Sequence, residues 1–148
     1  MIELLLFLHI LLFVFSFAFT AGIGILLDRV ARSRDTKAIH TAFSAAKPLS
    51  MTGGIGWILT ALVGAGLAHA YGLDMAAPWL VYSYIAFAVL ILTGFLLHSP
   101  WQAKVITASG SGGVGLDVLL QSPVHRIASG VSAVSVLTLI YLMTAKPG

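Results

Sequence analysis

Histidines are the side chains of this sequence best suited to chemistry. There are five among the 148 residues: His9, His40, His69, His98 and His125. A neutral imidazole binds transition metals and haem iron, and its charge changes near neutral pH. The sequence contains no Cys, which excludes thiolate metal sites, iron–sulfur clusters and disulfides. Its four Met residues are scattered and form no soft-ligand cluster, so we expect no metal other than haem iron.

The composition predicts that these histidines lie in a membrane protein. Hydrophobic residues make up 59% of the chain and charged residues only 9%, whereas about a quarter of the residues of a soluble domain are charged. The net charge of +3 comes from basic residues in short segments between apolar runs. That placement is typical of loops between membrane helices, so we expect a lipid bilayer as the surroundings and no nucleic acid partner.

Four apolar stretches predict four membrane-spanning helices, at about residues 2–27, 49–71, 78–98 and 125–144. A helix needs about 20 residues to cross the hydrocarbon core. The first stretch is longer than the apolar run of a signal peptide and begins with Glu3 instead of basic residues, so we expect it to be retained. The expected fold is all-α, a four-helix up-and-down transmembrane bundle in one integral membrane domain, residues 1–148.

The basic residues predict the orientation of this bundle. Seven of the eight Lys and Arg lie in the connections 28–48 and 99–124 or just after them, and only Lys146 lies at the other end. Positively charged connections stay in the cytoplasm, so both termini are expected on the extracytoplasmic side. Apolar residues recur at helical spacing within 28–48, which predicts an amphipathic helix along the membrane surface. They are Val30, Ala38, Ile39, Ala42 and Phe43.

Small residues predict how the first two helices pack. Residues with small or short side chains recur every four positions in the second helix: Gly56, Thr60, Gly64 and Ala68. Such a face lets another backbone approach closely. In the first helix His9, Ser16, Thr20 and Gly24 project within about 80° of one another, at about 100° per residue. His9 is therefore expected to face protein and not lipid.

His9 and His69 form a candidate haem site. Both are expected near the outer face, on adjacent antiparallel helices, where they could provide paired ligands to haem b. Phe13, Tyr82 and Tyr84 are candidate walls of that pocket. The alternative is that His9 donates a hydrogen bond to a Ser, Thr or backbone carbonyl of a neighbouring helix, while His69 meets interfacial water.

His98, His125 and Arg126 form a second candidate site, on the cytoplasmic side. Two imidazoles and a guanidinium flanking one connection suit an anion, a lipid head group or a propionate. The alternative is that His98 caps the end of the third helix and Arg126 only anchors the orientation. No Ser–His–Asp set can be assembled, and no carboxylate lies inside an apolar run beyond Glu3 at the very start of the first, so the catalytic residues stay unknown.

The stretch "SGSGGVG" in the second cytoplasmic connection matches a dinucleotide-binding fingerprint at Gly110, Gly112 and Gly115. That fingerprint acts only within a βαβ unit, and no second strand fits between the neighbouring membrane helices. We therefore expect residues 110–115 to be a flexible loop and the protein to bind no nucleotide.

Several short motifs together resemble a family of uncharacterised bacterial integral membrane proteins. They are "FLHILLF", "KPLSMTGGIGW", "APWLVYSY", "TGFLLHSPWQAK" and "LMTAKP". That family is distantly similar to copper-resistance-D-like membrane proteins and to the HemJ type of protoporphyrinogen oxidase. The resemblance implies a multi-pass protein of the bacterial inner membrane, with His9 at the position of the first-helix haem ligand of the HemJ type.

Two classes of function follow from these observations. The first is a small haem-b protein with a redox or haem-handling role, in which His9 and His69 hold the iron. The second is a non-catalytic accessory or structural subunit, which would pack onto other membrane subunits through the face from Gly56 to Gly64.

Overall fold

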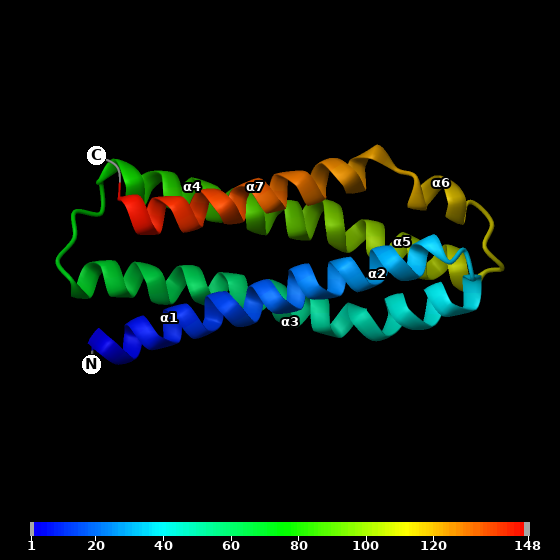
Figure 1. Ribbon diagram of the computed structural model, residues 1–148, viewed down its shortest axis with the longest axis horizontal. Coiled ribbons are helices and arrows are strands. Elements are labelled where there is room, and N and C mark those ends of the chain that lie inside the picture. Colours follow the sequence, from blue (N-terminus) through cyan, green and yellow to red (C-terminus); the bar gives the residue numbers. More distant parts are fainter. Residues whose placement is uncertain (1, 147–148) are drawn as a thin grey trace.

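The computed structural model describes residues 2–146, and four long helices run up and down in this part of the chain (Figure 1). The first helix consists of α1 (Ile2–Phe17), η1 (Ala18–Gly22) and α2 (Ile23–Arg32), and the second is α3 (Thr36–Ala70). The third consists of α4 (Pro78–Thr93), η2 (Gly94–His98) and α5 (Ser99–Gly110). The short α6 (Leu116–Leu120) leads to the last, α7 (Pro123–Ala145). All four are long and apolar enough to cross a membrane, which confirms the predicted all-α transmembrane bundle.

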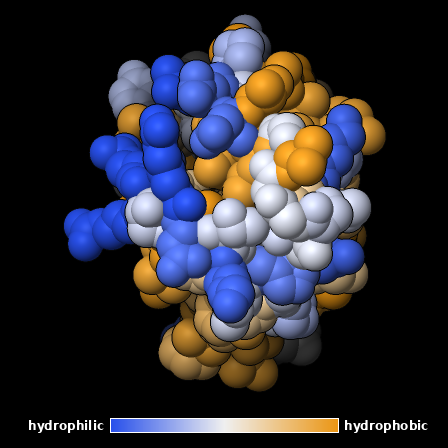
Figure 2. Space-filling model, turned by 90° about the vertical axis from the view of Figure 1, so that its right-hand side faces the viewer, coloured by the Kyte–Doolittle hydropathy of each residue, from blue (hydrophilic) through white to orange (hydrophobic). Residues whose placement is uncertain are grey.

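The ends of the bundle differ in character. The N-terminus, the C-terminus and the turn between α3 and α4 lie at one end, and the two other connections lie at the opposite end (Figure 1). Hydrophilic side chains gather on the face of that opposite end (Figure 2). It carries seven of the eight Lys and Arg residues, and we call residues 28–47 and 99–126 the basic end. That the basic end faces the cytoplasm stays a prediction.

The helices at the basic end continue well past the apolar stretches. The first helix ends at Arg32 instead of residue 27, α3 begins at Thr36 instead of residue 49, and the third helix reaches Gly110. The carboxylate of Asp35 starts α3 by accepting hydrogen bonds from the backbone N–H groups of Lys37 and Ala38, at 2.9 and 3.2 Å. A helix of 35 residues is about 52 Å long, against a hydrocarbon core of about 30 Å. The basic end therefore protrudes from the bilayer.

The protruding part has its own hydrophobic core. Ile39 and Phe43 of α3 and Val105 of α5 are completely buried there, and Leu27 of α2 and Leu116 of α6 pack against them. Four of the five apolar residues predicted to lie along the membrane surface thus face other helices, and only Ala38 is exposed. The prediction of an interfacial helix over part of 28–48 was wrong because α5 and α6, also expected to be loop, supply the partners that cover this stripe.

A second core lies within the membrane-spanning part and joins all four helices. Trp57 of α3 packs between Phe13 of α1 and Phe87 of α4, with ring centroids 5.3 and 6.2 Å away. Leu139 of α7 is buried in the same cluster. Around this core, α1 packs mainly on α3 and α4 packs mainly on α7, so the bundle consists of two helical hairpins.

The two hairpins repeat each other in build. Each first helix has 16 α-helical residues followed by a five-residue π-helical segment, η1 or η2. Each second helix has a proline 22 positions before its last residue. In α3 this is Pro48, before Ala70, and in α7 it is Pro123, before Ala145. A π segment widens one helical turn, so it rotates the residues that follow relative to those before it. Because η1 and η2 each follow 16 α-helical residues, the helix rotates at the same distance from the start of both hairpins.

Candidate functional site

The first helix meets α3 through its polar residues. The Nδ1 atom of His9 lies 3.0 Å from the backbone carbonyl oxygen of Thr60. The His9 ring lies so close to Gly64 that a Cβ added there would be 2.6 Å from its Cε1 atom. Ser16 contacts Gly56 in the same way. The structure thus brings His9 and Ser16 of the predicted polar stripe against the small residues of α3, and His9 faces protein. Gly24, the last member of the predicted stripe, is exposed and does not face α3.

Ala68 belongs to a different contact. It lies in a separate buried cluster near the end that holds the termini (Figure 1), together with Trp79, Leu80 and Leu142. The small-residue pattern therefore serves two neighbours: Gly56, Thr60 and Gly64 face α1, while Ala68 packs with residues of α4 and α7.

The candidate haem residues are not brought together. His69 is exposed near the end of α3, and the nine positions between it and Thr60 rotate it by about 180° from the contact that holds His9. Tyr82 and Tyr84 are exposed on α4, and Phe13 is packed against Trp57 in the core. In this conformation these residues do not fit a porphyrin held between paired imidazoles.

His98 and His125, by contrast, come together at the basic end. His98 is the last residue of η2 and His125 lies in the first turn of α7, and their ring centroids are 5.5 Å apart. The His125 ring stacks on Trp101 at 3.7 Å with an angle of 8° between the planes. The indole N–H of Trp101 donates to the backbone carbonyl of Leu119 at 2.9 Å. Trp101 therefore links α5, α6 and α7 and fixes the orientation of His125.

A cleft of about 490 Å³ opens beside His125, between α2, α6 and the first turn of α7. Its walls carry three arginines, two aspartates and a histidine beside the apolar Ala31 and Leu120. The lining residues are Asp28, Ala31, Arg32, Arg34, Asp117, Leu120, Gln121, His125 and Arg126. The sequence pointed to His125 and Arg126, but Arg32 and Arg34 were missed because they join the cleft only through the fold.

The charges of this cleft are unevenly compensated. A guanidinium N–H of Arg32 donates to the carboxylate of Asp28 at 2.8 Å, and this is the ion pair found within residues 2–146. Arg34 and Arg126 accordingly have no carboxylate of the described residues within 4.0 Å. The start of α7 adds the positive end of a helix dipole. These features suit a bound anion.

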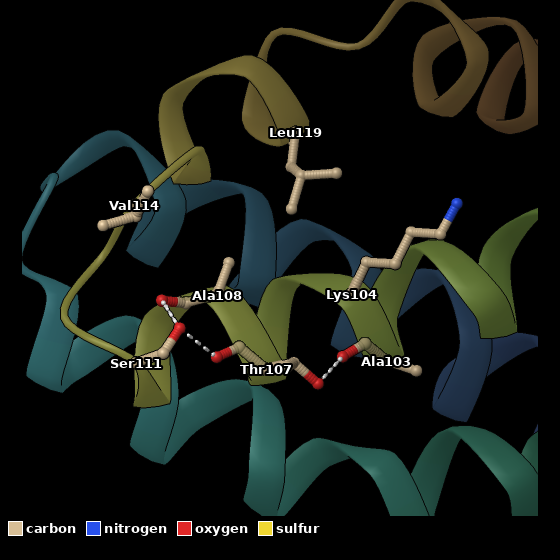
Figure 3. A pocket seen from close by; sticks show the side chains of 7 residues that line it. All are labelled: Ala103, Lys104, Thr107, Ala108, Ser111, Val114 and Leu119. Atoms are coloured by element: carbon tan, nitrogen blue, oxygen red, sulfur yellow. Dashed lines mark hydrogen bonds between the residues drawn. The ribbon is translucent and has the colours of Figure 1, made fainter.

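A second hollow of about 500 Å³ lies between α5 and α6, with Leu119 above Ala108 and Lys104 (Figure 3). The hydroxyl of Thr107 donates to the carbonyl of Ala103, and that of Ser111 donates to the carbonyl of Thr107. Because these hydroxyls donate to their own helix, the Lys104 ammonium is the main polar group left for a ligand. The cleft beside His125 is therefore the stronger candidate site.

The glycine-rich segment connects these elements. Gly112, Gly113 and Gly115 all have positive φ, between 74° and 88°, and they turn the chain from α5 into α6. Neither of the elements that flank them is a strand.

Within residues 2–146 no group of three or more His, Asp or Glu side chains is arranged to hold a metal ion. Comparisons with protein-family models, with curated proteins and with solved structures find no match for this chain.

Proposed function

We propose that this small multi-pass membrane protein binds an anionic, phosphate-bearing ligand in the cleft at its basic end. The observation that carries the proposal is the convergence of Arg34 and Arg126 on one cleft with no carboxylate partner for either. One comes from the turn before α3 and the other from α7. Their side chains reach the same hollow only in the folded bundle.

The chemistry of these groups favours phosphate. A guanidinium is always charged and presents a planar fork of donors that matches two phosphate oxygens. With His125 neutral, the three arginines exceed the two aspartates of the cleft by one charge. A ligand with a single negative charge would balance the site.

Phosphate binding to variants of the cleft tests this proposal. Titration calorimetry of the detergent-purified protein with inorganic phosphate should show binding that R126Q weakens about tenfold, because a hydrogen bond to a charged group is lost. K47Q is the matched control, since Lys47 is exposed at the same end but outside the cleft. Equal affinity of R126Q and the wild type would contradict the proposal.

Haem binding by His9 and His69 stays a prediction of the sequence and of the family resemblance. In the conformation described, the ring of His9 donates from Nδ1 to the carbonyl of Thr60, which leaves Nε2 unprotonated as an iron ligand requires, but His69 lies on another side of α3 and does not pair with it. The visible spectrum of the purified protein is the test. A Soret band lost in H9A would support haem binding, and a colourless, folded protein would refute it.

The role of an accessory subunit in the bacterial inner membrane likewise stays a prediction. The four helices that could each cross a membrane support the membrane location alone. Stoichiometric co-purification of other membrane chains in mild detergent would favour this role, and isolation as a lone monomer would count against it.

A further inference from the structure

We infer that the anion bound at the basic end is the head group of a membrane phospholipid, which enters the cleft sideways from the bilayer. This inference rests on the proposed function, because it names the class of ligand for the same cleft. Three observations favour a lipid over a soluble phosphate. They are the position of the cleft at the boundary between charged and apolar surface, the open space on its membrane side, and its excess of one positive charge.

The cleft lies where the surface of the bundle changes from charged to apolar. On α7 the exposed Arg126 is followed at once by Ile127, which is 64% exposed. On α2 the residue two positions before Asp28 is Leu26, which is 57% exposed. A membrane protein passes from water to acyl chains at such a boundary, and lipid phosphates lie at this level. An amphiphile with its phosphate in the cleft would keep its chains beside these apolar side chains.

Both walls of the cleft become open one helical turn further into the membrane. Gly24 lies four residues before Asp28 on α2, and Gly130 lies four residues after Arg126 on α7. A Cβ added at either glycine would meet nothing within 4 Å. Ser129 and Ala133 on α7 are exposed as well. The helix surfaces directly below the charged cleft thus leave free space in which an acyl chain can lie.

The charge of the cleft selects the kind of head group. The excess of one positive charge matches a phosphodiester, which carries one negative charge at neutral pH. Ala31 and Leu120 provide an apolar part of the wall that a free phosphate would not use. The other basic residues of this end add a general attraction to an anionic leaflet. A glycerophospholipid with an anionic head group, such as phosphatidylglycerol, fits these features.

The test separates the lipid from the phosphate. The full-length protein is titrated with phosphatidylglycerol or phosphatidylcholine and followed by native mass spectrometry, in parallel with inorganic phosphate by calorimetry. The double variant G24L/G130L fills the open space without touching the arginines. We expect it to weaken phosphatidylglycerol binding at least about tenfold and to leave phosphate binding unchanged. G66L is the matched control, because Gly66 also has nothing within 4 Å but belongs to α3, which does not line the cleft.

Each result decides one of the two claims. If G24L/G130L binds phosphatidylglycerol as well as the wild type, or if phosphatidylcholine binds equally well, no specific lipid site exists, and phosphate binding stands alone. If R126Q weakens both phosphatidylglycerol and phosphate while G24L/G130L weakens only the lipid, the inference is supported. If the wild type binds neither phosphate nor phosphatidylglycerol, the proposed function itself fails.

Discussion

Two histidines of this protein join helices through the same arrangement. His9 hydrogen-bonds to the carbonyl oxygen of Thr60 and packs on Gly64, four residues later. His40 at the basic end lies 3.1 Å from the carbonyl oxygen of Ile106 and packs on Gly110, again four residues later. In each case a carbonyl satisfies the ring nitrogen and a glycine one turn away makes room for the ring. Polar side chains between membrane helices commonly stabilise packing in this way.

The contact between His9 and Gly64 can be tested by adding one methyl group. G64A should destabilise the protein by about 1–3 kcal/mol, because the new Cβ would meet the His9 ring and the packed helices must move apart. Unfolding of the purified protein by heat or by SDS in mixed micelles measures the change. G66A, only two residues away, should be close to neutral because its Cβ meets nothing within 4 Å.

A double-mutant cycle distinguishes this contact from a general effect of alanine. H9A removes the ring, so the methyl group of G64A should cost much less in the H9A background than in the wild type. Residues in direct contact show such coupling, whereas independent sites add. Simple additivity of H9A and G64A would show that the ring does not occupy the space over Gly64.

At the scale of elements, the protruding core gives the next prediction. F43A should destabilise the basic end by about 3–5 kcal/mol, because a fully buried aromatic side chain is lost from a closed cluster. Hydrogen exchange should then become faster in the first turns of α3 and in α5, with little change in the membrane-spanning core. V118A, at a position 77% exposed on α6, should change the stability by less than about 0.5 kcal/mol. Equal protection in F43A and V118A would contradict a separate core at this end.

The sequence predicted the four helices because hydropathy depends only on local composition. It also predicted that His9 faces protein and not lipid, since Ser16 and Thr20 share its side of the helix. It did not predict that α3 begins at Thr36. The charges near Lys37 resembled a loop, although Ile39 and Phe43 already showed helical spacing and Asp35 was a suitable cap.

The cleft and the π segments lay further beyond sequence reasoning. Arg32 and Arg126 are far apart in the chain and line one cleft only because the fold brings the last turn of α2 beside the first turn of α7. The π segment η2 has no signature in the composition of "GFLLH", yet it sets the direction in which His98 projects toward His125. The sequence identified His98, His125 and Arg126 as a group, but the arginines that complete the cleft required the fold.

At the scale of the whole molecule, the basic residues and the turns of both hairpins lie at the same end of the bundle. The repeated hairpins both begin at the end that holds the termini, and both turn at the basic end (Figure 1). The protruding core, the stacked Trp101 and His125, and the charged cleft therefore all lie on one side of the bilayer. The side of the membrane that the basic end faces therefore decides which leaflet can supply a lipid to the cleft.

Cysteine labelling determines that direction, and the absence of native Cys makes each introduced thiol unique. S111C and M75C are suitable because Ser111 and Met75 are exposed at opposite ends and both changes preserve every Lys, every Arg and the Asp35 cap. In intact cells a membrane-impermeant maleimide should label M75C directly and S111C only after permeabilisation, because the seven basic residues predict that their end faces the cytoplasm. The reverse pattern would place the basic end outside, and the cleft would then draw its lipid from the outer leaflet.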